Sequence, residues 1–239
     1  MKKYIGTKQI EAEPMTMGEA YERGLLQVDR VPDAEYAKRM GYHVKYANGY
    51  ESWSPAEPFE EAYKLADTSL DRMQIEAEEV NGRYVKLAAF IDSGKMDEVV
   101  NDMYNKCLLE MQCCTMFDYI RLLDTRIQRM QGSDGAKVIK MNFGMAIMAL
   151  KAGFPIRRSG WNGKGLMVFK QVPAHIDSDV IPKMQSLPQS AKDLILKGKG
   201  FIDYTSQCLI YNENTGRADS WVPSISDVFA EDWEIVMEK

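Results

Sequence analysis

The chain has 239 residues, of which 45% are hydrophobic and 27% are charged, as is usual for globular proteins. Its formal net charge of −5 argues against a protein that binds DNA through a basic domain surface. The start, MKKYIGTKQIEAEP, has no apolar run of signal-peptide length, and no segment approaches the ~18 apolar residues of a membrane span. We therefore expect a cytoplasmic protein whose partners include neither DNA nor a membrane.

Cysteine and histidine offer little for metal or nucleophilic chemistry. The cysteines match no CxxC spacing, and a Ser-His-Asp triad would have to use one of only two histidines. We therefore expect buried thiols, no metal site, no cofactor and no catalytic centre. The residues concerned are Cys107, Cys113, Cys114, Cys208, His43 and His175.

Residues 1–66 predict a small α+β module. The segment 42–46 alternates as a strand, Asn48-Gly49 supplies a two-residue hairpin turn, and 50–53 forms the returning strand. The segment 55–63 then predicts a short helix. This module resembles a small domain at the start of many phage proteins.

Residues 67–132 predict an antiparallel helical hairpin. Apolar residues recur at alternating spacings of three and four, which is the pattern of a coiled-coil seam. Residues 92–94 interrupt it, and 95–108 either form a separate turn or extend the second helix. Such hairpins dock on a domain, pair with a second copy or offer a groove to a partner helix, and this one resembles hairpins of crAss-like phage proteins. The first seam is Leu70, Met73, Ala77, Val80, Tyr84, Leu87 and Ile91, and the second is Leu109, Cys113, Met116, Ile120, Leu123, Ile127 and Met130.

The glycine-rich segment 131–135 predicts a linker to a third domain at 136–239. That domain opens on a cationic stretch, residues 136–172, which contains no Asp or Glu. In an acidic protein such a stretch indicates either a local anion site or a solvated basic face. Its cations are Lys137, Lys140, Lys151, Arg157, Arg158, Lys164 and Lys170.

The third domain predicts one helix and a small antiparallel sheet. Asn142 is expected to cap a helix that begins at Phe143 and ends at Gly153. An inserted stretch, 173–200, contains a predicted helix at 189–197 and either covers a ligand pocket as a lid or changes which nucleotide fits. Ser226 is expected to cap a short turn. Strands are expected at 156–158, 166–172, 201–204, 208–211, 218–221 and 233–237.

The turn at 159–165 carries the chemistry of a ligand site. It sets Trp161 beside three glycines, which let backbone amides approach a ligand closely, and it follows Arg157 and Arg158. An indole stacks on a base, and the planar fork of arginine suits phosphate. The ligand that fits is therefore a base attached to phosphates. Neither GxxxxGK[ST] nor GxGxxG occurs, so a nucleotide-hydrolysing motor is not expected.

Three motifs between Met141 and Val236 resemble the phage family of Thoeris anti-defence protein two: MNFGMAIMALKAG, the basic pair before GWNGKG, and SWVPSISDVFAEDWEIV. Members are small α+β proteins that oligomerise and hold a nucleotide immune signal, glycocyclic ADP-ribose, without degrading it; some also hold cyclic oligonucleotides. The resemblance implies a homo-oligomer, dimer or tetramer, in the cytoplasm of the infected bacterial host. It places the stacking tryptophans at Trp161 and Trp221. The other ligand-binding residues expected are Phe143, Arg157, Arg158, Asn162, Gly163, Lys164, Ser226 and Asp227.

The N-terminal module and the third domain share two short patterns. Met-x-x-Gly-x-Ala begins at Met15 and at Met141, and Ser-Trp-x-Pro begins at Ser52 and at Ser220. The patterns indicate an internal duplication in which the first copy lacks the basic pair and the GWNGKG turn. We therefore expect Trp53 to anchor a core or an interface.

The leading hypothesis is a phage anti-defence protein that sequesters the Thoeris signal without catalysis. One alternative is a sponge for the cyclic di- or trinucleotides of CBASS-type immunity. Another is a nucleotide-processing enzyme with Asp227, Asp232 or Glu234 as general acid or base. A third alternative places the function in the helical hairpin.

Overall fold

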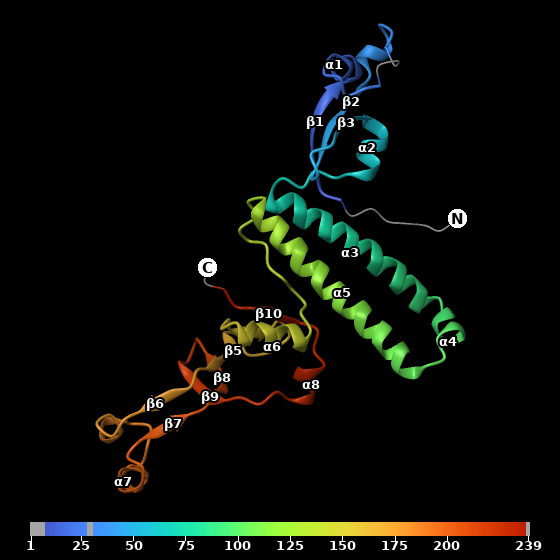
Figure 1. Ribbon diagram of the computed structural model, residues 1–239. Helices are drawn as coiled ribbons and strands as arrows, with labels where there is room; N and C mark the ends of the chain where they lie inside the picture. The colour runs from blue at the N-terminus through green and yellow to red at the C-terminus, as the bar shows by residue number, and fades with distance from the viewer. Residues whose placement is uncertain (1–7, 28–30, 238–239) are drawn as a thin grey trace. The chain divides into compact units, whose positions relative to one another are not determined.

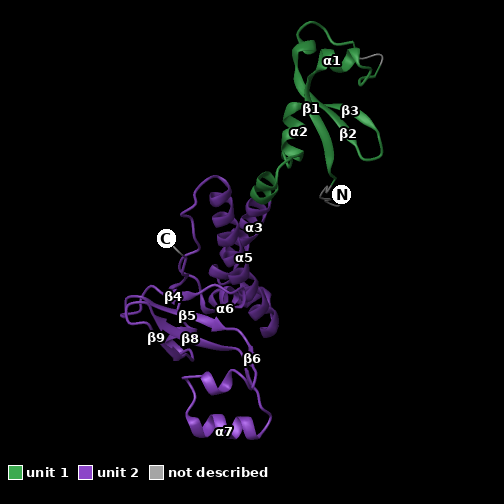
Figure 2. Cartoon of the chain, turned by 90° about the vertical axis from the view of Figure 1, so that its left-hand side faces the viewer, with its two compact units in different colours: residues 1–75 green, residues 76–239 purple. Residues whose placement is uncertain are grey.

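The structure is a computed structural model that describes residues 8–27 and 31–237 (Figure 1). The chain divides into two compact units, Met1–Ile75 and Glu76–Lys239 (Figure 2). The division falls inside a long helix, so the three domains predicted at 1–66, 67–132 and 136–239 stay a prediction. The predicted α+β class is confirmed, because helices and antiparallel sheets both occur in the described residues.

The N-terminal unit contains a three-stranded antiparallel sheet in the order β1-β2-β3. The predicted hairpin is confirmed as β2 and β3, with Gly49 in the turn at φ +81°. The strand β1 and the helix after it were not predicted; Thr16 and Glu19 begin that helix with a reciprocal capping box. The elements are β1 (Ile10–Thr16), α1 (Met17–Glu22), the short 3-10 helix η1 (Tyr36–Lys38), β2 (Met40–Tyr46), β3 (Glu51–Pro55) and α2 (Ala56–Ala62).

Trp53 lies half-buried against this sheet. Its Nε1 donates a hydrogen bond to the backbone oxygen of Met15 at 3.0 Å. A Cβ added at Gly41 would lie 2.5 Å from the indole, so the glycine makes room for the ring. Met15 and Ala20 are buried in the same module, whereas Val44 is buried on the opposite face of the sheet, because its neighbour His43 is the register partner of Trp53. Trp53 therefore anchors the core of this module.

The predicted helical hairpin is confirmed. It consists of α3 (Ser69–Asp92) and α5 (Met103–Met130), which lie side by side in Figures 1 and 2, with the short α4 (Lys95–Val99) between them. Residues 95–108 thus form a separate turn and also supply the start of α5, where Asp102 is the cap. Every position of both predicted seams is buried or half-buried except Met130. No helix within the described residues is long and apolar enough to cross a membrane.

The C-terminal part contains a five-stranded antiparallel sheet in the order β10-β4-β5-β8-β9. Every predicted strand is present, with bounds that differ by one or two residues at most ends. The strands are β4 (Ile156–Arg158), β5 (Leu166–Gln171), β8 (Gln207–Asn212), β9 (Arg217–Ser220) and β10 (Trp233–Ile235), and a short helix, α8 (Ile225–Val228), precedes β10.

The inserted stretch forms a small substructure of its own. It contains a two-stranded hairpin, of which only the second strand, at 201–204, was predicted. The side chains of His175 and Asp203 form a hydrogen bond of 2.5 Å between the two strands. The predicted helix at 189–197 is confirmed, with Gly198 as its cap. The elements are β6 (Ala174–Ile176), η2 (Ile181–Lys183), α7 (Gln189–Lys197) and β7 (Ile202–Tyr204).

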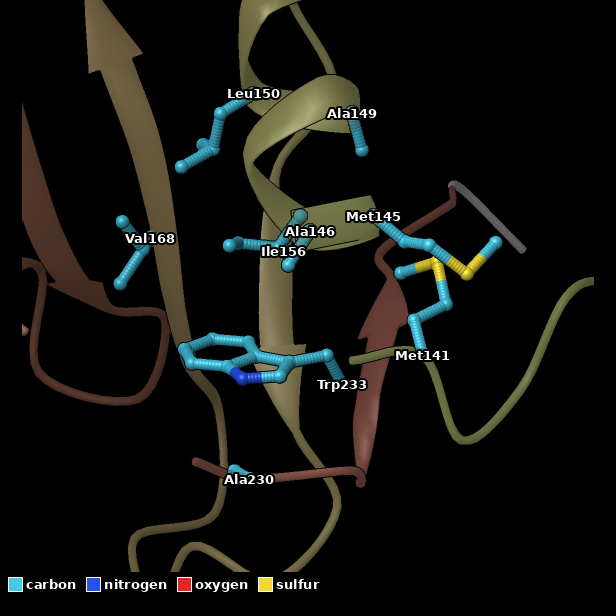
Figure 3. Packing of buried hydrophobic residues seen from close by; sticks show 9 residues of the cluster. All are labelled: Met141, Met145, Ala146, Ala149, Leu150, Ile156, Val168, Ala230 and Trp233. Atoms are coloured by element: carbon cyan, nitrogen blue, oxygen red, sulfur yellow. The ribbon is translucent and has the colours of Figure 1, made fainter. Parts of the chain in front are cut away.

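One helix, α6 (Phe143–Lys151), packs on the five-stranded sheet, as predicted. Asn142 caps it by accepting a hydrogen bond from the Met145 amide at 2.9 Å, and Gly153 at φ +90° follows its end. Met141 and Trp233 exchange two backbone hydrogen bonds, so the start of α6 is tied to β10. Figure 3 shows the resulting core: Met141, Met145, Ala146, Ala149, Leu150, Ile156, Val168, Ala230 and Trp233.

Two local predictions were wrong. Ser226 does not cap the short helix; Ser224 does, because the Ser224 hydroxyl and the Asp227 carboxylate satisfy each other's backbone amides. The expectation of buried thiols fails for Cys107 and Cys114, which are exposed on α5. Both lie on the face of α5 that points away from the seam with α3. The coiled-coil spacing predicts no partner for that face.

Candidate aromatic binding site

A fully buried tryptophan forms the centre of the candidate site. Trp233 has no exposed surface, and its Nε1 donates to the backbone oxygen of Asp227 at 3.1 Å. Trp161 and Trp221 lie nearly perpendicular to it, at 77° and 79°, with ring centroids at 5.5 and 6.1 Å. Phe143 is the third neighbour, at 5.7 Å. One core ring therefore positions three residues that were predicted to bind ligand.

The two predicted stacking residues lie between the core and solvent. Both Trp161 and Trp221 are half-buried and pack against the hydrophobic cluster. Perpendicular packing on Trp233 is a favoured arrangement of aromatic rings, and it fixes each indole plane. The Trp161 Nε1 also donates to Asp227 at 3.3 Å, which fixes its rotation. Each tryptophan therefore contributes to the core and also leaves part of its ring open to a ligand.

Arg158 is surrounded by acceptors. Its Nε donates to Asp232 Oδ1 at 2.7 Å, and its Nη1 donates to Asp227 Oδ1 at 3.0 Å and to the Ser226 backbone oxygen at 3.2 Å. The side chain is only 19% exposed. The hydrogen bond that Arg158 donates to Asp232 raises the pKa of Arg158, against the effect of burial, and the bond that it donates to Asp227 adds to this increase. Arg158 therefore holds the segment around α8 to β4.

Asp227 is the buried charged residue of the described chain. Its Oδ2 accepts hydrogen bonds from the Ser224 amide and hydroxyl, while Oδ1 accepts from Arg158 and Trp161. Burial by itself would raise the pKa of Asp227, but the bonds from Ser224, Arg158 and Trp161 outweigh it and hold the pKa below its usual value. Asp227 is thus an ionised acceptor that links α8 to the predicted ligand turn.

Asp232 bonds to the backbone of that turn. Its Oδ2 accepts from the Gly160 amide at 2.8 Å, and its backbone oxygen accepts from the Ser159 amide at 3.0 Å. Burial favours a higher pKa for Asp232, yet the bonds from Arg158 and Gly160 are stronger and lower it. A Cβ at Gly160 would lie 2.6 Å from the carboxylate. The glycine therefore serves a contact inside the protein.

Arg157 has a different environment from its neighbour. It pairs with Glu234, its partner in the β4–β10 register, at 2.6 Å from Nε to Oε1. Its side chain is 42% exposed, and its two Nη atoms have no hydrogen bond within the described residues. Lys137 also approaches Glu234, at 3.7 Å. Arg157 can therefore still donate to a ligand.

Acids from the end of the chain neutralise part of the cationic stretch. Lys137, Arg157 and Arg158 pair with carboxylates between positions 227 and 234. The other four cations form no ion pair among the residues that the structure describes: Lys140, Lys151, Lys164 and Lys170. The stretch thus contains both structural arginines and available lysines.

The turn at 159–165 is held from two sides. The Lys164 backbone oxygen accepts from Asn214 Nδ2 at 2.6 Å, and Gly165 takes a positive φ of +76° close to Glu213. Three residues of this turn were predicted to bind ligand, and all three are exposed: Asn162, Gly163 and Lys164. The β8–β9 loop therefore supports the turn while its polar atoms remain accessible.

The structure brings together six of the ten predicted residues around Trp233. Ser226 is the least engaged, since its side chain is exposed and contacts only Ser224 Oγ at 2.8 Å. Trp233 itself was missed as a site residue, although its place between Asp232 and Glu234 in a strand signals one buried side chain between two polar ones. The six are Phe143, Arg158, Trp161, Trp221, Ser226 and Asp227, while Arg157, Asn162, Gly163 and Lys164 lie on β4 and its turn.

No group of three or more His, Cys, Asp or Glu side chains is arranged for a metal ion within residues 8–27 and 31–237. Comparison with known proteins assigns this region. The Thoeris anti-defense 2-like domain matches residues 141–236. Thoeris anti-defense 2 of Bacillus phage SP01 is 34% identical over 102 residues, which cover 41% of this chain and 96% of that protein.

The chain belongs to the Thoeris anti-defense 2-like family. The matched range ends one residue after β10, so the Thoeris anti-defense 2-like domain includes the α6 core, the turn and the network of Arg158. A second family, Sequestin, matches residues 67–129, which correspond to the helical hairpin. The resemblance noted from the three sequence motifs is therefore confirmed.

Proposed function

We propose that this protein is a phage anti-defence protein that binds a cyclic ADP-ribose-type signalling nucleotide and holds it intact in the cytoplasm of the bacterial host. The observation that carries the proposal is the pair of half-buried tryptophans, Trp161 and Trp221, fixed perpendicular to Trp233. The name of the SP01 relative supports the anti-defence role. The proposed ligand is glycocyclic ADP-ribose.

The fixed rings supply affinity for a base. Stacking on an aromatic side chain contributes about 1–3 kcal/mol per base. Because Trp161 is held by both Trp233 and Asp227, little conformational freedom is lost when a base binds. A protein that outcompetes an immune effector needs high affinity, and nanomolar binding corresponds to about −12 kcal/mol. Assembly of several chains would increase the contacts available to one ligand.

Phosphate groups would meet Arg157 and Lys164 rather than Arg158. Arg158 already donates to two carboxylates and a carbonyl, whereas Arg157 keeps free Nη atoms and Lys164 has an exposed ammonium group. A guanidinium with free Nη donors forms charge-assisted hydrogen bonds with phosphate. The arginine pair therefore divides into one ligand-binding residue and one positioning residue.

The same network disfavours the alternative of a nucleotide-processing enzyme. A general base works best when its pKa lies near the working pH. The pKa values of Asp227 and Asp232 are instead held below their usual value, and Glu234 is paired with Arg157. These carboxylates fix the fold of the site, which supports sequestration without turnover.

The test is to identify the molecule that the protein binds in cells and to determine whether the protein alters that molecule. The full-length protein is purified from cells that produce Thoeris or CBASS signals and then denatured, and the released molecule is identified by mass spectrometry. We expect intact glycocyclic ADP-ribose. Release of a cyclic di- or trinucleotide would instead support the CBASS alternative.

A second incubation separates binding from catalysis. Protein and excess glycocyclic ADP-ribose are mixed, and the ligand is quantified over time. More than one equivalent of product per protein would overturn the sequestration proposal. The double variant W161A/W221A is the matched control, because it should neither bind nor alter the ligand.

A further inference from the structure

A hydrogen bond connects helix α5 of the hairpin to the first residue of the α6 cap. The Nδ2 of Asn142 donates to Asp118 Oδ2 at 2.6 Å, across 24 residues of the chain. The Oδ1 of the same side chain accepts from the Met145 amide at 2.9 Å and so caps α6. Because Oδ1 accepts an amide proton, the carboxamide has one orientation, in which Nδ2 faces the carboxylate. The cap of α6 is therefore fixed from α5.

The segment between the two helices is also bonded to α5. The Nη1 of Arg129 donates to the backbone oxygen of Asp134 at 2.5 Å and to that of Ala136 at 3.0 Å. The glycine-rich segment 131–135, predicted as a linker, is thus held to the end of α5 by one side chain. The hairpin helix and α6 both lie in the compact unit Glu76–Lys239. They are joined by bonds at two places and not by a free tether.

Asp118 lies where the outer side of α5, the side away from α3, changes from exposed to mostly buried. Tyr104 and Met111, nearer the start of this side, are 70% and 59% exposed. The side chains of Asp118 and Arg121 are only 20% and 21% exposed, and the Arg121 Nη1 lies 3.6 Å from Asp118 Oδ1. A hydrogen bond to a charged group shielded from water contributes more than one on an open surface.

The residues on both sides of Asn142 contact the central ring of the candidate site. Met141 exchanges two backbone hydrogen bonds with Trp233, and the Phe143 ring lies 5.7 Å from the Trp233 ring. Trp233 in turn fixes the planes of the two predicted stacking residues. Close packing transmits a displacement from one side chain to the next. A change at Asn142 therefore reaches the rings that are proposed to hold the base.

We propose that Asp118 is a positioning residue for the nucleotide site, so that the helical hairpin and the site influence each other. The inference rests on the proposed function and adds a residue from outside the family match at 141–236, in the hairpin that the Sequestin family matches. Coupling between two sites is reciprocal. If the bond from Asn142 to Asp118 strengthens nucleotide binding, bound nucleotide strengthens that bond by the same factor.

An exchange of the two partners tests the bond itself. Asn142→Asp keeps an oxygen that can cap α6 but places a second carboxylate against Asp118. The double variant D118N/N142D restores the hydrogen bond with its donor on α5 and its acceptor on the cap. Asn142→Ser is a milder change, because a serine hydroxyl also caps a helix and adds no charge. Asp124→Asn, at an exposed carboxylate of α5, is the matched control.

Calorimetric titration of these full-length variants with glycocyclic ADP-ribose gives the effect on the site. N142D should weaken binding by at least about fivefold, the lower end of a typical coupling between two sites. N142S should weaken it less, D118N/N142D should bind as the wild type does, and D124N should be unchanged. Wild-type affinity in both single variants at position 142, or a double variant that binds no better than N142D, would overturn the proposal.

Hydrogen exchange distinguishes positioning from a merely structural role. In the wild type, ligand should slow exchange in the middle of α5 as well as in α6, and N142D should lose the effect on α5 while D118N/N142D regains it. Slowing in α5 that persists in N142D would contradict the coupling. If the wild type binds no glycocyclic ADP-ribose, the proposed function fails, and ligand-free exchange still tests Asp118. N142D should then expose the first turn of α6 and D118N/N142D should protect it; equal exchange in both would overturn the positioning role.

Discussion

The N-terminal module and the C-terminal domain use the same local pattern for different purposes. In both, a buried methionine precedes a short helix with a fully buried alanine: Met15 and Ala20 in one, Met141 and Ala146 in the other. In the first module Trp53 bonds to Met15, and in the domain Trp233 takes that place through its backbone bonds to Met141. Trp221 matches Trp53 in the sequence pattern, but it does not make the bond to the buried methionine that Trp53 makes. Trp221 is therefore an additional tryptophan in the C-terminal domain.

The two regions also differ in how they hold charge. In the N-terminal sheet the half-buried His43 lies between the exposed carboxylates of Glu13 and Glu51, at 3.3 and 2.9 Å. In the C-terminal domain Arg158 bonds two carboxylates beside the aromatic cluster. The comparison indicates that shared scaffold signals fix a helix on a sheet, whereas ligand chemistry depends on groups added around it.

The largest effect is expected from removal of the central ring. Trp233→Ala should destabilise the C-terminal domain by about 3–5 kcal/mol, because it empties a fully buried aromatic site. Hydrogen exchange measured by mass spectrometry should show lost protection at 141–236 and native protection at 10–27 and 31–55. Trp53→Ala should give the reverse pattern, and equal loss in both regions would contradict the separation of the two cores.

Asp227→Asn should be nearly as damaging. The substitution leaves Arg158 without one of its ionised partners in a site where the Asp227 side chain is only 11% exposed. Removal of one partner from a buried ion pair costs about 3 kcal/mol. Denaturant unfolding measures the loss; Asp219→Asn, on exposed β9, is the control that should unfold as the wild type does. A fully stable D227N would show that the network does not hold the site.

Trp161→Ala and Trp221→Ala should weaken nucleotide binding by about 1–3 kcal/mol each. We expect folded proteins, because Trp233 remains to fill the core. Calorimetric titration gives the affinity and thermal unfolding gives the stability of the same samples, with W53A as a control outside the site. A large fall in melting temperature with unchanged affinity of the folded fraction would identify both rings as core anchors only.

The two arginines should separate by their effects. Arg157→Gln should weaken binding by about 1.5 kcal/mol, the lower end for a hydrogen bond to a charged group, with little change in stability. Arg158→Gln should instead lower stability, since it leaves Asp227 and Asp232 without their cation. Titration and thermal unfolding of both variants test whether Arg157 binds ligand and Arg158 positions the site. A stable R158Q together with an R157Q that binds normally would contradict these roles.

The smallest effect expected is a dependence of stability on acid. Asp232 has a lowered pKa in the folded protein, so it stabilises the fold fully above its unfolded value of about 3.9. That stabilisation is lost as the pH falls below about 4 through the folded-state pKa, because the unfolded chain then binds more protons. Asp232→Asn should reduce this loss. Unfolding midpoints from pH 3 to pH 6 measure it, and D179N, an exposed carboxylate of the insertion, should retain the wild-type slope.

Local patterns predicted most of the architecture because the signals act over a few residues. The heptad spacing predicted both seams of the hairpin, and Asn142 and Gly153 marked the limits of α6. The prediction missed β1, whose polar alternation in IEAEPMT leaves mainly Met15 buried. It also misplaced the cap of α8, since Ser224 and Ser226 both precede the apolar pair Val228-Phe229 and only the chain geometry selects one.

The sequence by itself determined the fold class, the helical hairpin and the helix on an antiparallel sheet, and it predicted Trp161 and Trp221 as ligand-binding residues. Only the tertiary structure decided that Trp233 orients those rings and that the two arginines have different partners and different exposure. The reason is separation along the chain: Arg158 and Asp232 are 74 residues apart, and Arg157 and Glu234 are 77 apart. A stretch without acids reads as a continuous cationic surface in sequence, whereas the antiparallel pairing of β4 with β10 brings the compensating carboxylates to it.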